Sequence, residues 1–170
     1  MPRMLVDHKA LFKRLTKNCE TALLNAAQQA VQARHYEITI EHFLLALLDD
    51  ADSDIAFIVS HYDLNPSQMR ATLTRGLDDL RQGNSGRPTF SPVLLEWMQD
   101  AWVVGSVDLG WQNIRSGVLF LRLVQQPNKY STSGIGLVLE AIPRDDMKKN
   151  LPTILAGSKE GCPCRESAPS

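Results

Sequence analysis

The sequence has few of the features that direct a protein to nucleic acid, to a membrane or to a disulfide-stabilised fold. Its 170 residues carry 18 basic and 19 acidic side chains, a formal net charge of −1. Such a balance produces no overall field that attracts nucleic acid or an anionic membrane. No apolar run approaches the roughly 18 residues of a membrane span, and the N-terminal segment lacks the pattern of a secretory signal.

Cysteine is also scarce. There are three cysteines, and Cys19 stands alone in a helical pattern. An odd count without paired spacing argues against a disulfide framework and favours the reducing cytoplasm as the location. Cys162-Pro163-Cys164 has one intervening residue and lacks two further ligands, so it does not predict a zinc site.

Motifs for catalysis and for cofactors are missing as well. The sequence contains neither the Gly-x-x-x-x-Gly-Lys-Ser/Thr loop that binds ATP nor a Gly-x-Ser-x-Gly nucleophile elbow. Asp50, Asp52 and Asp54 imitate the start of a calcium loop, but Ile55 stands where that loop needs glycine. His42 follows Glu41 without further metal ligands in helical register. We therefore expect no catalytic residue, no cofactor and no metal in this chain.

What the sequence does contain is helical periodicity. Apolar residues recur at every third or fourth position, and sustained period-two alternation is absent, so we expect an all-α fold with little or no sheet. Thr39, Asn65, Ser91 and Ser116 are predicted helix N-caps, and Pro66 and Pro92 occupy favoured first positions. The predicted helices cover residues 4–15, 19–33, 40–48, 55–62, 66–81, 92–109, 118–124, 135–142 and 143–151.

The chain also repeats itself. Ile38 and the apolar run after it match Ile114 and the run after that, at an offset of 76 residues. Two copies predict a pair of pseudo-twofold-related helical repeats rather than an open solenoid. The expected domain is 1–160, with an extra amphipathic helix at 4–15, repeat one at 16–82, a linker at 82–90, repeat two at 91–156 and a flexible tail at 157–170. The seam between two such repeats is a natural groove for a partner helix.

Several motifs, in this order, resemble a known family. Ile38 and the run Glu41-His42-Phe43-Leu44-Leu45-Ala46-Leu47-Leu48 resemble the signature of the N-terminal repeats of Clp/Hsp100 unfoldases. Phe90-Ser91-Pro92 is similar to the family's junction before repeat two. The second repeat departs from the signature, with Gly117-Val118 where the first has Glu41-His42. Further stretches resemble the ClpV type of type VI secretion systems: 34–37, 53–55, 101–103, 114–117, 141–145 and 151–153.

The resemblance implies a function. ClpV-type proteins are hexameric AAA+ ATPases that disassemble contracted sheaths, and their N-domain docks an N-terminal helix of the large sheath subunit (VipB/TssC) in a hydrophobic groove. This implies a non-catalytic, cytoplasmic recruitment domain, monomeric alone, with ATP and Mg²⁺ bound in rings beyond residue 170. The expected groove residues are Leu5, His8, Leu11, Phe12, Leu15, Phe90, Leu94, Leu95 and Met98.

Other interpretations remain open at this point. Any of the expected groove residues can instead belong to the protein's own core, because most apolar residues at helical spacing are core residues. The chain can also be the N-domain of a general Clp/Hsp100 chaperone that binds unfolded clients or another adaptor. A small hydrolase or metal enzyme is the third alternative, and the missing catalytic cluster argues against it.

Overall fold

Helices make up nearly all of the regular structure in the computed structural model of this chain. The structure describes residues 8–130, 134–158 and 160. Within these residues the one sheet is a parallel pair of two-residue strands, β1 (Glu37–Ile38) and β2 (Thr89–Phe90). The all-α class is therefore confirmed. No helix in the described ranges is long and apolar enough to cross a membrane.

The helices of repeat one begin after capping residues, of which the sequence predicts Thr39 and Asn65 but not Thr16. Thr16 Oγ1 accepts a hydrogen bond from the Cys19 backbone N–H (3.3 Å). Asn65 Oδ1 accepts one from the Gln68 N–H (3.2 Å). Each bond satisfies an orphan donor in the first turn of a helix. The helices are α2 (Lys17–Gln32), α3 (Ile40–Leu48), α4 (Asp54–His61) and α5 (Pro66–Asp78).

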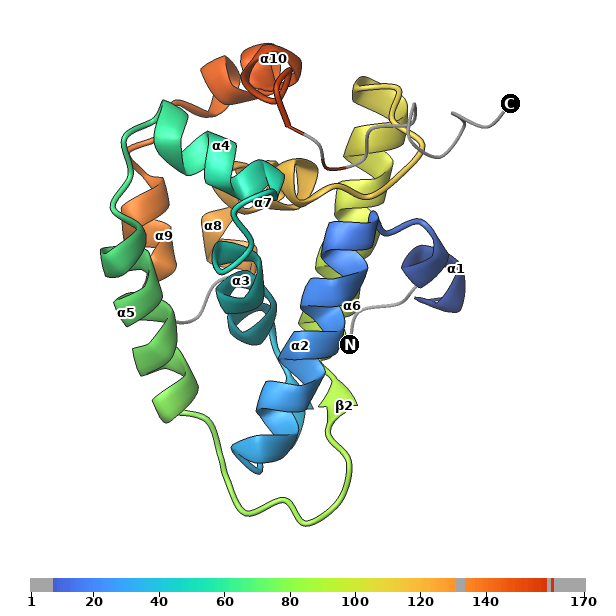
Figure 1. The fold of residues 1–170 in the computed structure, drawn as a ribbon, viewed down its shortest axis with the longest axis vertical. Helices are drawn as coiled ribbons and strands as arrows, with labels where there is room; N and C mark the ends of the chain where they lie inside the picture. The colour runs from blue at the N-terminus through green and yellow to red at the C-terminus, as the bar shows by residue number, and fades with distance from the viewer. Residues whose placement is uncertain (1–7, 131–133, 159, 161–170) are drawn as a thin grey trace.

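Repeat two follows the same order at the predicted offset. The central helices α3 and α7 begin at Ile40 and Ser116, 76 residues apart. Gly110, with φ of 70°, follows the π-helical turn that extends α6, where the sequence predicts the end of that helix. Figure 1 shows α10 and α4 at one end of the molecule and the α5–β2 connection at the other. The elements are α6 (Pro92–Val103), η1 (Val104–Asp108), α7 (Ser116–Gln125), α8 (Pro127–Tyr130), α9 (Ile135–Leu139) and α10 (Arg144–Ile154).

The two repeats are joined by reciprocal backbone pairing. Ile38, just before α3, pairs in parallel with Phe90, just before α6. Ile114, just before α7, pairs in parallel with Leu15, just before α2. In each repeat, the segment just before the central helix therefore pairs with the segment at the start of the other repeat. This exchange is what the pseudo-twofold relation predicts.

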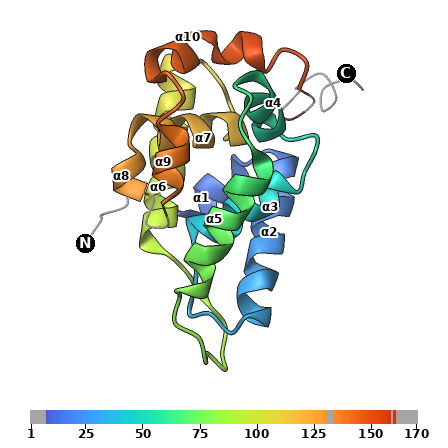
Figure 2. The same ribbon diagram turned by 90° about the vertical axis from the view of Figure 1, so that its left-hand side faces the viewer.

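A continuous core fills the space between the repeats. Phe43 of α3 and Trp97 of α6 are fully buried and meet edge to face, with ring centroids 5.7 Å apart. Trp97 Nε1 donates to the Leu119 carbonyl of α7 (2.9 Å), so the only polar atom of the indole is satisfied. Helix α5 packs beside α9 across the repeats (Figure 2). One core therefore serves both repeats.

Three local features differ from the sequence prediction. Arg115 takes the N-cap position of α7, and Ser116 is its first residue. Gly117, which stands where the first repeat has Glu41, leaves no room for a side chain, because a Cβ there would lie 2.6 Å from Leu155 Cδ1 and 3.0 Å from Asp54 Oδ2. Within the tail predicted from residue 157, Ser158 and Glu160 bond to buried groups of both repeats. Residues 161–170 lie outside the described part.

Candidate functional site

The extra N-terminal helix lies beside the first helix of repeat two. Its described part is α1 (His8–Lys13), which packs against α6 (Figure 1). The predicted residues 4–7 of this helix lie outside the described residues. The surface between the two helices is called the α1–α6 seam below, and it consists of Leu11, Phe12, Leu15, Phe90, Leu94, Met98 and Trp102.

The floor of the seam is closed by apolar side chains. Leu11 is 1% exposed, and Leu94 and Met98 are fully buried. Leu15 is also buried, so these four predicted groove residues belong to the protein's own core. They form the base on which a partner helix can rest. Their contact with a partner remains a prediction.

The rim of the seam is more open. Phe12 and Phe90 are half-buried and pack with their ring centroids 5.1 Å apart. The predicted groove residue Leu95, on α6, is also half-buried, and its contact with a partner stays a prediction. A half-buried apolar side chain can lose more exposed area when a partner packs over it, which stabilises a complex. Leu5 lies outside the described residues, and so does the side chain of His8.

Trp102 completes the seam and is absent from the sequence-based set. Its half-buried ring lies under the Arg14 guanidinium, 4.9 Å from the ring centroid. It stands four residues after Met98 and eight after Leu94, so helical spacing could have identified it. Aromatic and arginine side chains are also enriched among the residues that dominate binding energy at interfaces.

Backbone hydrogen bonds anchor α1 at its C-terminal end. The Ile114 N–H donates to the Arg14 carbonyl (2.6 Å), and the Thr16 N–H donates to the Ile114 carbonyl (3.2 Å). Asn113 Nδ2 adds a bond to the same Arg14 carbonyl (3.3 Å). The position of this short helix therefore depends on its contact with the segment that precedes α7.

The outer face of α1 is basic. Lys9, Lys13 and Arg14 are exposed along it. On another face of α6, Glu96 and Asp100 are paired with the Lys129 ammonium at 3.5 and 3.1 Å. Of these cations, Arg14 lies at the seam, over Trp102, and a carboxylate beside the apolar face of a bound helix would complement it.

An apolar hollow lies on repeat one, away from the seam. It has a volume of about 410 Å³ and lies where the end of α3, α4 and the start of α5 meet. It offers an alternative position for a bound segment, but no part of α1 contributes to it. Its lining residues are Leu48, Ala51, Ala56, Val59, Ser60, Asp63, Leu64 and Pro66.

The aspartates that imitate a calcium loop point to separate partners. Asp50 accepts a hydrogen bond from Asn18 Nδ2 (2.7 Å), whereas Asp54 forms a two-bond ion pair with Arg115 (2.8 and 2.9 Å). The described residues contain no group of three or more His, Cys, Asp or Glu side chains placed to hold a metal ion. Asp50 and Asp54 therefore each have a partner within the fold.

His42 also has a structural role. The Thr39 backbone N–H donates to His42 Nδ1 (3.0 Å), which makes Nδ1 an acceptor and leaves the proton on Nε2. His42 Nε2 then donates to His35 Nδ1 (2.9 Å). Both rings are buried. Burial, and secondarily the charge on His35, lower the pKa of His42 to about 4.

Because the pKa of His42 is low, we expect the free energy of unfolding to fall in mild acid. The pKa of histidine is about 6.5 in an unfolded chain and about 4 for His42 in the folded protein. As pH falls from 6.5 to 4, only the unfolded state takes up the proton, so the free energy of unfolding falls. The expected loss is about 3 kcal/mol, at about 1.4 kcal/mol per pH unit.

Urea denaturation at pH values between 7 and 4 measures this loss. In a His42→Gln variant, the loss in the free energy of unfolding that His42 causes between pH 6.5 and 4 should disappear, whatever the variant's absolute stability. An unchanged pH dependence in that variant would assign the acid sensitivity to other groups.

Comparisons with known proteins agree with this fold. The family model described as Clp repeat (R) N-terminal domain matches residues 14–133. The AAA+ ATPase ClpV1 of Pseudomonas aeruginosa is 24% identical over 131 residues, which cover 76% of this chain and 14% of that protein. The chain therefore corresponds to a small part of this relative.

Solved structures extend the match to nearly the whole chain. The N-domain of ClpV from Vibrio cholerae has a TM-score of 0.87 at 29% identity, covering 94% of this chain and 96% of that one. A complex of a ClpV N-domain with a VipB peptide has a TM-score of 0.83 at 27% identity, covering 94% and 98%. Because the family match includes well over half of its residues, this chain belongs to the Clp repeat N-terminal domain family.

Proposed function

We propose that this chain is the recruitment domain of a ClpV-type AAA+ unfoldase, and that it binds an N-terminal helix of the large type VI sheath subunit in the α1–α6 seam. The observation that carries the proposal is the seam itself, with a closed apolar floor and a half-buried aromatic rim. A ClpV N-domain of the same fold forms a complex with a VipB peptide. ATP and Mg²⁺ would be bound by parts of the protein outside this chain, in the cytoplasm.

The chemistry of the seam fits an amphipathic helix. Phe12 and Phe90 lie near the start of α6 and Trp102 lies near its end, so the apolar surface follows α6. A helix places apolar side chains at positions i, i+3, i+4 and i+7 on one face, which matches an elongated seam better than a round pocket. Arg14, just after α1 and over Trp102, then faces the polar flank of that helix.

The expected affinity is moderate. Three or four inserted apolar side chains contribute about 1.5–3 kcal/mol each, or roughly 5–10 kcal/mol in total. Ordering a free peptide into a helix costs several kcal/mol of this gain. A dissociation constant in the micromolar range follows for one domain, and several copies on a hexamer would add avidity.

Titration of a fluorescently labelled peptide tests the proposal. The probe is the N-terminal helix of the large sheath subunit, and the control is a peptide of the same composition whose apolar residues no longer share one face. We expect saturable micromolar binding of the first peptide and at least tenfold weaker binding of the control. Equal binding of both peptides, or of unfolded casein, would favour a general chaperone domain. No binding at several hundred micromolar would overturn the proposal.

A further inference from the structure

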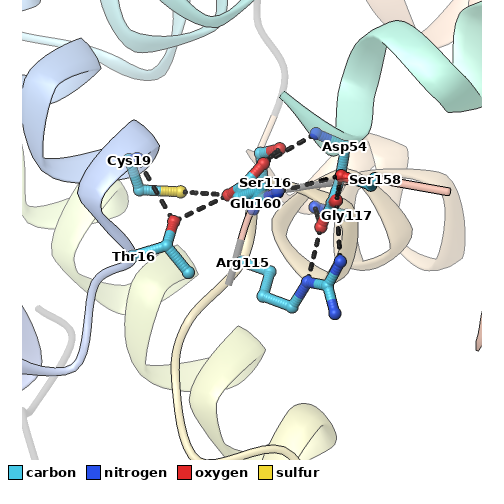
Figure 3. Close-up of polar contacts among 8 residues, drawn as sticks. All are labelled: Thr16, Cys19, Asp54, Arg115, Ser116, Gly117, Ser158 and Glu160. Atoms are coloured by element: carbon cyan, nitrogen blue, oxygen red, sulfur yellow. Dashed lines mark hydrogen bonds and ion pairs between the residues drawn. The ribbon is translucent and has the colours of Figure 1, made fainter. Parts of the chain in front are cut away.

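A glutamate that follows the last helix lies fully buried between the repeats. The Glu160 side chain is 0% exposed. Its Oε1 accepts hydrogen bonds from Thr16 Oγ1 (2.7 Å), the Ser116 backbone N–H (2.7 Å) and Cys19 Sγ (3.2 Å). Its Oε2 accepts from Ser116 Oγ and from the Asp54 N–H, both at 2.6 Å. Figure 3 shows these side chains converging on the carboxylate.

The donors come from the N-terminal ends of three helices. Thr16 caps α2, Asp54 is the first residue of α4, and Ser116 is the first residue of α7. Helix N-termini carry partial positive charge and unpaired N–H groups, which favour an anion. One carboxylate from the C-terminal segment therefore joins both repeats, and it engages the Ser116 hydroxyl that the sequence suggests as a cap.

This carboxylate lies directly beside the anchor of α1. Thr16 and Ser116 are close neighbours of the Leu15–Ile114 bridge, whose hydrogen bonds hold the last turn of α1 against repeat two. Glu160 ties the two sides of this bridge together, because it accepts a hydrogen bond from each. Loss of the carboxylate leaves buried donors without a partner just where α1 is attached.

We propose that Glu160 is a positioning residue for the α1–α6 seam, holding the end of α1 in the place that accepts a partner helix. The proposal rests on the proposed function for the identity of that helix, but the anchoring of α1 can be measured without it. In this proposal, Glu160 after α10 contributes to peptide binding through the position of α1. Coupling between two sites is reciprocal, so a helix bound in the seam should also hold Glu160 in its buried position.

The test compares Glu160→Gln with Glu140→Gln, which makes the same change of charge at an exposed glutamate. Hydrogen exchange measures the backbone N–H groups of Thr16 and Ile114, which hold α1, against those of α5 as an internal reference. Peptide titration measures affinity at a temperature where both variants are folded. Ser158→Ala is a second variant that keeps the Glu160 carboxylate. It removes the bond that the Ser158 hydroxyl accepts from the Glu160 backbone N–H (3.2 Å) and the bond that it donates to Asp54 Oδ1 (2.5 Å).

We expect faster exchange at Thr16 and Ile114 in Glu160→Gln, no selective change in Glu140→Gln, and five- to tenfold weaker peptide binding in the former alone. Ser158→Ala should shift both readouts in the same direction by less. In the wild type, bound peptide should slow exchange at the Asp54 and Ser116 N–H groups, which bond to Glu160.

If exchange in Glu160→Gln rises uniformly, α5 included, or if the affinity for the peptide is unchanged, the positioning role is overturned. If the wild type binds no peptide, the sheath proposal fails, and the exchange comparison alone decides the role of Glu160.

Discussion

Glutamate in place of Phe12 should weaken binding of the sheath helix by on the order of thirtyfold or more. Phe12 is half-buried on α1 and packs against Phe90 at the rim of the seam. A carboxylate there removes apolar contact area and must be desolvated when the peptide packs over it, which costs several kcal/mol. A factor of thirty corresponds to about 2 kcal/mol. Trp102→Glu, at the other end of the seam, should act in the same direction.

A matched control separates binding from general effects of charge. Ala71 is exposed on α5, which Figures 1 and 2 place on the side of the molecule away from α1. Ala71→Glu adds the same charge and should leave affinity within about twofold. Circular dichroism melts confirm that the variants are folded. If the α5 variant weakened binding as much as Phe12→Glu, the loss would reflect net charge and not the seam.

Removal of the Arg115 side chain should cause the largest loss of stability, about 3–5 kcal/mol. Arg115 pairs with Asp54 through two hydrogen bonds of 2.8 and 2.9 Å, and the Asp54 side chain is 0% exposed. Arg115→Ala therefore leaves a buried carboxylate without its counter-charge. It also removes the stacking of Arg115 on Trp111, 4.8 Å from the ring centroid. Urea denaturation at neutral pH measures the change.

Arg70→Ala is the control for this pair. Arg70 and Asp49 approach to 2.6 Å, but their side chains are 45% and 63% exposed. An exposed ion pair contributes about 0–1 kcal/mol, because water screens it in either state. The two variants should therefore differ by at least about 2 kcal/mol. Equal losses would show that Asp54 does not depend on Arg115 in the folded protein.

Local chemistry made most of the fold predictable. Asn65 and Pro66 start α5 as expected, because capping and the fixed φ of proline act within one turn. The Ile38 and Ile114 runs place the central helices, because an all-apolar helix must be buried. The end of α5 at Asp78 falls one turn short of the prediction, since helical periodicity weakens gradually and no glycine marks the end there.

The contacts that hold the seam could not be read from the sequence. Glu160 stands in a segment rich in small and polar residues, a composition that predicts a flexible tail. Its partners Thr16, Asp54 and Ser116 are 144, 106 and 44 residues away along the chain. Only the fold brings these helix starts together, and so only the structure reveals that a carboxylate joins them.

The candidate site was partly predictable for a similar reason. Periodicity identifies which side chains of α1 and α6 face inward, but it does not separate a buried floor from an open rim. Leu94 and Leu95 are neighbours in sequence, yet one is fully buried and the other half-buried. That difference depends on packing in the folded protein, which spacing along one helix does not show.

The location of the bound helix tests the central claim most directly. A two-dimensional NMR titration of the isotope-labelled domain with unlabelled sheath peptide reports every affected N–H group, including the indole N–H of each tryptophan. We predict that the largest shift changes fall on α1, on β2 around Phe90, and on the indole of Trp102. Changes centred instead on the hollow beside Leu48, Val59 and Leu64 would contradict the account.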